Sequence, residues 1–122
     1  MKFTQSTHST LTVRQISKGA IRIGDEKITE NVILFRDEIK RDHGLIRAVD
    51  LNEGMIEDLV AKQPEIIIFG CGFKPIIPPK NLIFALARKG IGFECMDTPA
   101  ACRTFNILIS EDRDAAAILI LN

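Results

Sequence analysis

The chain has 122 residues, of which 46% are hydrophobic and 26% are charged, values typical of a compact globular domain. Sixteen basic residues balance sixteen acidic ones, so the sequence predicts no net positive field to attract nucleic acid or an anionic membrane. A chain of this length is expected to form a single domain over residues 1–122.

Targeting and metal-binding patterns are absent from the sequence. The polar residues 1–10 lack the apolar stretch of a secretory signal, and the longest apolar run, Ala115–Leu121, is too short to span a bilayer. We therefore expect a cytoplasmic protein without membrane insertion. The three cysteines form no Cys-x-x-Cys pair and both histidines lie apart from them, which argues against a disulfide framework and against a zinc site. No metal or cofactor is predicted.

Short alternating stretches separated by turns fill the first third of the chain. They are Leu11–Ile16, Ile21–Ile23, Lys27–Thr29 and Asn31–Phe35, and they predict a meander or paired hairpins. The charged residues 36–42 that follow are expected to form a surface loop or hairpin tip without a functional site.

The apolar spacing changes to that of a helix from Asn52 onward. Asn52 could cap a helix that ends before Pro64 and whose inner face carries Met55, Ile56, Leu59 and Val60. The continuous apolar run of residues 65–69, closed by Gly70-Cys71-Gly72, is typical of a strand that is buried on both faces.

Two further helix–strand pairs complete the chain. We expect a helix over Lys80–Lys89, ended by Gly90, then a strand over Ile91–Cys95, a helix within Met96–Arg113 and a last strand over Ala115–Leu121. This alternation predicts an α/β fold of three layers, a largely parallel sheet between helices, with the N-terminal hairpins or meander as an additional layer.

The carboxyl ends of the strands that finish at Phe69 and Cys95 should meet at one edge, where open α/β sheets bind ligands. The loops Gly70–Gly72 and Asp97–Pro99 should then face each other. Gly-x-Gly lacks the third glycine of a dinucleotide loop, and no phosphate loop is present, so a strand-to-loop turn is favoured for it.

The third helix begins with a capping signal. Thr98 is suited to the N-cap and Pro99 to the first helical position. Backbone N–H groups at this terminus could bind a small anion or a carboxylate. Asp97, just before the predicted cap, could instead complement the helix dipole itself.

Cys102 and the polar stripe of the third helix are the candidates for chemistry. The dipole and Arg103 could lower the pKa of the Cys102 thiol, but no histidine base is near in sequence, and a buried apolar role is favoured. One face of the helix carries a polar stripe formed by Arg103, Asn106, Ser110 and Arg113. We favour the interpretation that this stripe is simply exposed to solvent over the interpretation that it is a binding surface. Asn106 is the member to test first.

The segments Ile66–Gly72 and Met96–Leu108 together resemble the Mth-type domains of unknown function, a family that includes a mitochondrial respiratory complex I assembly factor and an adipogenesis-associated protein. The resemblance is densest over residues 65–119. It implies a three-layer fold around a mixed sheet whose last strand runs antiparallel to its neighbours, and no established enzymatic activity. At the Cys71 position the family usually has threonine. The family pattern falls on Gly70, Gly72, Asp97, Thr98, Ala101, Cys102, Thr104, Asn106 and Leu108.

The leading hypothesis is a non-enzymatic binding or assembly-factor-like protein with a protein partner, and no catalytic residue is assigned. The alternative is a small-molecule enzyme or thiol redox protein that uses Cys102, with or without Cys71. The predicted recognition crevice is formed by Gly70, Cys71, Gly72, Asp97, Thr98, Cys102, Arg103 and Asn106.

Overall fold

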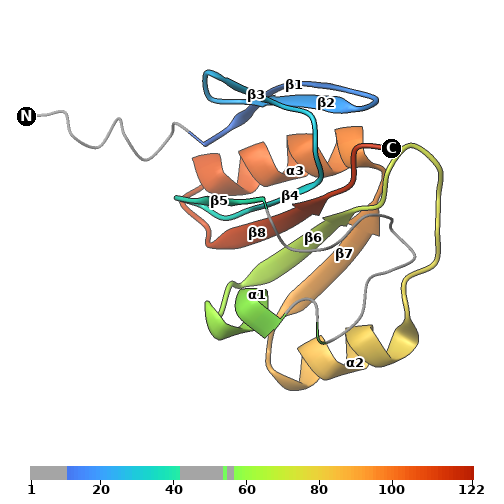
Figure 1. The fold of residues 1–122 in the computed structure, drawn as a ribbon. Helices are drawn as coiled ribbons and strands as arrows, with labels where there is room; N and C mark the ends of the chain where they lie inside the picture. The colour runs from blue at the N-terminus through green and yellow to red at the C-terminus, as the bar shows by residue number, and fades with distance from the viewer. Residues whose placement is uncertain (1–10, 42–53, 55–56) are drawn as a thin grey trace, which may run out of the picture.

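A computed structural model describes residues 11–41, 54 and 57–122 of the chain (Figure 1). In chain order its elements are β1 (Val13–Ser17), β2 (Ala20–Ile23), β3 (Glu26–Ile28), β4 (Val32–Leu34), β5 (Ile39–Lys40), α1 (Glu57–Ala61), β6 (Ile66–Gly70), α2 (Lys80–Arg88), β7 (Gly92–Met96), α3 (Thr98–Ser110) and β8 (Ala115–Leu119).

The central sheet has five strands in the order β5-β4-β8-β6-β7. β6 is parallel to both β7 and β8, while β4 is antiparallel to β8 and β5 is antiparallel to β4. The mixed sheet is therefore confirmed, with two parallel and two antiparallel strand pairs. The expectation that the last strand opposes its neighbours is wrong on one side. The α3 crossover leads from β7 to β8 and brings β8 beside β6 in the same direction, because crossover connections join parallel strands.

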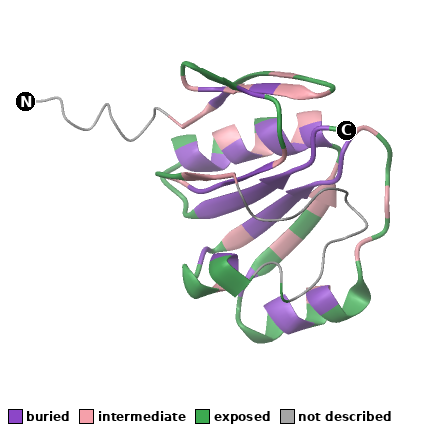
Figure 2. Ribbon diagram, in the orientation of Figure 1, coloured by how far each residue is buried: buried purple, intermediate pink, exposed green. Residues whose placement is uncertain are grey.

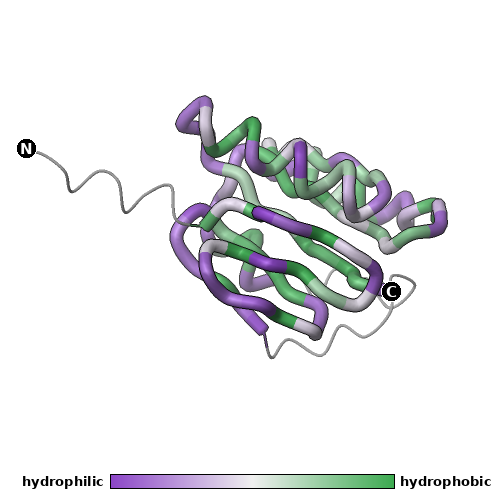
Figure 3. Tube along the Cα trace, turned by 90° about the horizontal axis from the view of Figure 1, so that it is seen from above, coloured by the Kyte–Doolittle hydropathy of each residue, from purple (hydrophilic) through white to green (hydrophobic). Residues whose placement is uncertain are grey.

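Helices cover both faces of this sheet, and a second sheet forms an outer layer. α3 lies on one face, and α1 and α2 lie on the other (Figure 1). The small sheet β1-β2-β3 packs on the far side of α3, so that α3 is enclosed between two sheets. Seen from above in Figure 3, hydrophobic and hydrophilic residues alternate along the small sheet, as expected for strands with one face buried.

The core is divided by the central sheet into two clusters. Alternate residues of β6 and β8 point to opposite faces, and all five residues of β8 are buried (Figure 2). The cluster on the α3 face includes Ile68, Phe105 and the isoleucines of β2. The cluster on the α2 face includes Phe69 and Leu86.

One difference from the predicted elements concerns a short segment. The charged segment contains the two-residue strand β5, which pairs with β4 through Ile33 and Lys40, so the predicted hairpin tip carries a strand. α1 ends at Ala61, before Pro64 as predicted. The predicted cap Asn52 and the residues Met55 and Ile56 lie outside the described residues.

No helix in the described ranges is both long and apolar enough to cross a membrane.

Candidate functional site

The two loops at the carboxyl ends of β6 and β7 meet, as predicted. The N–H of Cys71 donates a hydrogen bond to the carbonyl oxygen of Met96 at 2.9 Å, and the N–H of Thr98 donates to the carbonyl oxygen of Gly72 at 2.8 Å. The ladder between the two strands therefore continues into both loops. Backbone bonds join the loops directly at these positions.

Thr98 joins this pair of loops to the end of β8. Its side chain is fully buried, and its hydroxyl accepts a hydrogen bond from the N–H of Gly72 at 2.9 Å. The same hydroxyl donates to the carbonyl oxygen of Ile120 at 2.6 Å. The hydroxyl therefore donates and accepts hydrogen bonds within the sheet edge, and no bond to the first turn of α3 is formed within the part of the chain that the structure describes.

The N-cap of α3 is Asp97, and the prediction of Thr98 as the cap is wrong. Asp97 has an extended backbone with φ −63° and ψ 159°, and its Oδ1 accepts a hydrogen bond from the N–H of Ala100 at 2.8 Å. Pro99 lies at the start of the helix as predicted. The alternative in which Asp97 complements the helix terminus itself is the arrangement observed.

This capping also bears on the predicted anion site. The N–H of Ala100 is bound to the Asp97 carboxylate, the N–H of Ala101 to the Asp97 carbonyl, and the N–H of Thr98 to Gly72. The protein's own carboxylate therefore lies at the helix terminus where an anion would bind. An anion or carboxylate ligand at this site stays a prediction.

The two glycines are positions where an added side chain would crowd neighbouring atoms. A Cβ on Gly70 would lie 3.0 Å from the Cβ of Ala101 and 3.1 Å from the Cα of Thr98. Gly72 has φ +102°, and a Cβ there would lie 2.4 Å from the carbonyl oxygen of Asn122. Close packing of α3 and the chain end therefore accounts for Gly-x-Gly, in line with the expected strand-to-loop turn.

Cys102 is buried in the cluster on the α3 face, with 2% of its surface exposed. Burial raises the pKa of its thiol to about 12, although the charge of Arg103 acts in the opposite direction. This direction is opposite to the lowered pKa that the helix start suggested. Cys71 belongs to the cluster on the α2 face, so the central sheet separates the two thiols that were considered as a pair.

Asn106 binds the outer sheet. Its Oδ1 accepts a hydrogen bond from the N–H of Val13 at 2.9 Å, and its Nδ2 donates to the carbonyl oxygen of the same residue at 2.8 Å. Arg103 and Ser110, its companions in the predicted stripe, are exposed. The stripe is therefore divided between a residue that anchors β1 and residues that face solvent.

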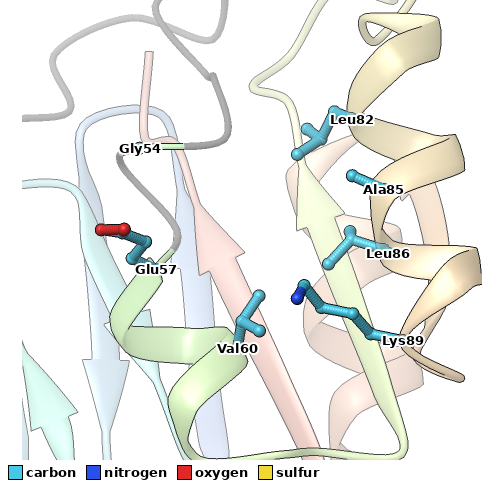
Figure 4. Close-up of a pocket in the computed structure, with 7 residues that line it drawn as sticks. All are labelled: Gly54, Glu57, Val60, Leu82, Ala85, Leu86 and Lys89. Carbon is cyan, nitrogen blue, oxygen red and sulfur yellow. The ribbon is translucent and has the colours of Figure 1, made fainter.

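A cavity of about 270 Å³ between α1 and α2 was not predicted from the sequence (Figure 4). Val60 faces Leu86 across it, and the Lys89 side chain extends toward Val60, whereas the Glu57 carboxylate points away from α2. The cavity is lined mostly by apolar side chains, and Lys89 is its positively charged residue. The apolar periodicity of both helices was the one sequence feature that could have indicated the cavity. The same periodicity is expected of residues packed in the core, so it could not distinguish the two. The lining residues are Gly54, Glu57, Val60, Leu82, Ala85, Leu86 and Lys89.

Comparison with protein families gives a match over almost all of the described chain. A family model described as "Protein of unknown function (DUF498/DUF598)" matches residues 13–120. The chain belongs to the DUF498/DUF598 family. The match includes the five-stranded sheet, α3 and the outer sheet.

The chain is similar in sequence to two proteins with different names. The chain is 29% identical over 104 residues to "NADH dehydrogenase [ubiquinone] 1 alpha subcomplex assembly factor 3" of Xenopus tropicalis, which covers 85% of this chain and 57% of the relative. It is 33% identical over 70 residues to the "13 kDa major membrane protein" of Francisella tularensis subsp. holarctica (strain LVS), which covers 57% of each chain. The matches thus span little more than half the length of these relatives.

A solved structure supports the fold of this DUF498/DUF598 member. The solution NMR structure of a Mth938-like domain from Bordetella pertussis superposes with a TM-score of 0.80 at 20% identity, covering 93% of this chain and 87% of that domain. The predicted α/β fold and the resemblance to Mth-type domains and to the complex I assembly factor are confirmed.

Proposed function

We propose that the chain is a non-enzymatic binding protein that recognises a protein partner in the manner of an assembly factor. The observation that carries this proposal is the similarity over 104 residues, 85% of the chain, to a relative named as an assembly factor. That span is most of the chain, so the similarity is not confined to one motif of the domain.

The exposed side of α3 is the surface we assign to this partner. Arg103 and Ile107 are four residues apart and are therefore neighbours on one helix face. Ile107 is 57% exposed, Arg103 is exposed one turn before it, and Asp97 is exposed at the helix start. An apolar residue with charged neighbours is a common composition for a protein interface.

The predicted crevice residues divide into two groups under this proposal. Asp97 and Arg103 are exposed and contact the partner. The others support the surface from within. Gly70, Cys71, Gly72 and Thr98 hold the start of α3 against the ends of the central strands, Cys102 is buried beneath the helix, and Asn106 holds the helix to β1 of the outer sheet.

Site-specific photo-cross-linking in cells tests the proposal. A photoreactive side chain placed at Arg103 or at Ile107 should give the same discrete protein adduct. The matched control is Ile77, an isoleucine that is 88% exposed in the connection between β6 and α2, where no such adduct is expected. An adduct that forms at Ile77 alone would place the partner elsewhere and contradict the assigned surface.

Substitutions then test whether the surface is needed. Ile107→Lys should abolish recovery of the cross-linked partner by the tagged chain, whereas Ile77→Lys should leave it unchanged. Lysine is a good helix former and suits the later turns of a helix, so the fold should be retained. Unchanged recovery with Ile107→Lys would overturn the proposal.

A further inference from the structure

Two cysteines lie together on the α2 face of the central sheet, at the carboxyl ends of β6 and β7. Phe69 of β6 is paired with Cys95 of β7 in the parallel register. Cys71 follows Phe69 by two residues, and the continued ladder from Cys71 to Met96 keeps it in strand-like register. Because side chains alternate along a strand, Cys71 shares the face of Phe69 and therefore that of Cys95.

The two thiols lie in the same apolar cluster. Cys71 is buried in the cluster on the α2 face, and Cys95 packs against that cluster. The Cys71 Sγ donates a hydrogen bond to the carbonyl oxygen of Lys74 at 3.6 Å. Both thiols are free. Cys71 is 5% exposed and Cys95 is partly exposed, so the pair is reached from the Cys95 side.

The register places the two residues too far apart for an unstrained disulfide. Neighbouring strands lie about 4.8 Å apart and two residues advance the chain by about 6.6 Å, so the two Cα atoms are separated by roughly 8 Å. Disulfides require Cα atoms within about 7 Å. A metal ion between the sulfurs removes this limit, because two metal–sulfur bonds of about 2.3 Å place the sulfurs about 4.6 Å apart.

We propose that Cys71 and Cys95 form a two-coordinate site for a thiophilic monovalent cation, for which Cu(I) is the appropriate probe. Soft thiolate ligands select Cu(I), and the position at the carboxyl ends of parallel strands is where α/β sheets bind ligands. On binding, both S–H bonds break, two metal–sulfur bonds form and two protons leave to solvent, with no change in oxidation state.

The surroundings favour this ion over zinc. A structural zinc site has four protein ligands, and the part of the chain that the structure describes holds no cluster of three or more histidine, cysteine, aspartate or glutamate residues able to bind a metal. The cation would also offset the charge of two neighbouring thiolates, which repel each other in a half-buried site. Cys102, on the opposite face, takes no part.

A competition titration tests the site. The reduced chain, under anaerobic conditions, is titrated with Cu(I) held by a chromogenic chelator, and one equivalent should transfer to the protein. Cys71→Ser and Cys95→Ser should each lose this equivalent, whereas Cys102→Ser, the matched control from the other face, should retain it. Retention by Cys95→Ser, or loss with Cys102→Ser, would overturn the proposal.

A measurement on the unsubstituted chain avoids any dependence on how the variants fold. Iodoacetamide labelling, followed by peptide mass analysis, should show that Cu(I) prevents the alkylation of Cys95. An alkylation rate at Cys95 that is the same with and without Cu(I) would refute the site. Formation of an intramolecular Cys71–Cys95 disulfide by a mild oxidant, in a chain that takes no Cu(I), would refute it as well.

Discussion

Because the thiol of Cys102 is buried, the free energy of unfolding should depend on pH in the alkaline range. Burial raises its pKa from 9.0 to about 12, with Arg103 as a weaker opposing influence. Above the ordinary thiol pKa the unfolded chain releases this proton, while the folded chain keeps it. The unfolded state then binds fewer protons, so the free energy of unfolding falls as pH rises from about 9 toward 12.

The alkaline loss of stability should therefore be smaller in Cys102→Ala than in the unsubstituted chain. Urea unfolding under reducing conditions, compared between about pH 9 and pH 10.5, should show a difference in slope of about 1 kcal/mol per pH unit. The slopes should agree between about pH 6 and pH 7.5, where the thiol titrates in neither state. A shared slope in the alkaline range would show that the thiol of the folded chain ionises normally.

The sequence predicts which residues lie at the start of α3 more readily than it predicts which contact each of them makes. The tripeptide Asp97-Thr98-Pro99 predicts the start of a helix, but Asp97 and Thr98 are both good N-cap residues. The choice between them depends on Ile120, whose carbonyl takes the Thr98 hydroxyl from 22 residues away. No local pattern contains that information, which is why Thr98 was expected at the cap and is observed within the sheet edge.

At the scale of the elements, Gly72 sets how closely the β6 loop approaches the chain end. Its φ of +102° disfavours any other residue, and a Cβ would contact the backbone oxygen of Asn122, which no side-chain rotation can relieve. Gly90 is a matched control, because it has φ +76° but no atom within 4 Å of an added Cβ. A substitution at Gly90 therefore measures the cost of backbone strain alone, whereas one at Gly72 measures backbone strain together with steric overlap.

Gly72→Ala should destabilise the fold more than Gly90→Ala does. Both substitutions incur the strain of a positive φ, about 1–3 kcal/mol, and Gly72→Ala adds an overlap that costs about 1–3 kcal/mol more. Urea unfolding of the two variants in parallel measures the difference. Equal losses of stability would mean that the segment around Asn122 moves away without cost.

The elements themselves were predictable where their own sequences are periodic or continuously apolar. β6, α2 and β7 match the expected segments to within about one residue, within the usual uncertainty of element ends. α3 ends at Ser110, so Arg113, which was predicted on its polar stripe, lies outside the helix. β5 was missed because its two residues, Ile39 and Lys40, lie among charges and owe their strand conformation to pairing with β4. The register that brings Cys71 to Cys95 is likewise a property of two strands together.

At the scale of the whole molecule, α3 is held between two sheets, and this arrangement depends on long-range contacts. The sequence predicts an N-terminal meander or paired hairpins as an additional layer, but not which element that layer covers. Asn106 binds Val13 across 93 positions of the chain. Beneath this contact, Ile21 and Ile23 of the outer sheet share one core cluster with Phe105 of α3. The outer sheet is therefore attached by apolar burial and by polar contacts, which are the two Asn106 hydrogen bonds, the hydrogen bond from the Gly19 N–H to the Leu121 carbonyl oxygen and the Arg41–Glu26 ion pair.

Removal of the Asn106 hydrogen bonds should loosen the outer sheet before the central one. Asn106→Ala leaves the N–H and carbonyl groups of Val13 without their side-chain partner, at a cost of about 1–3 kcal/mol. Native-state hydrogen exchange should then accelerate by about tenfold or more in β1 and β2, and much less in β6 and β8. Arg103→Ala, on the exposed side of the same helix, should change neither region. Equal acceleration in both sheets would show that the two layers open as one cooperative unit.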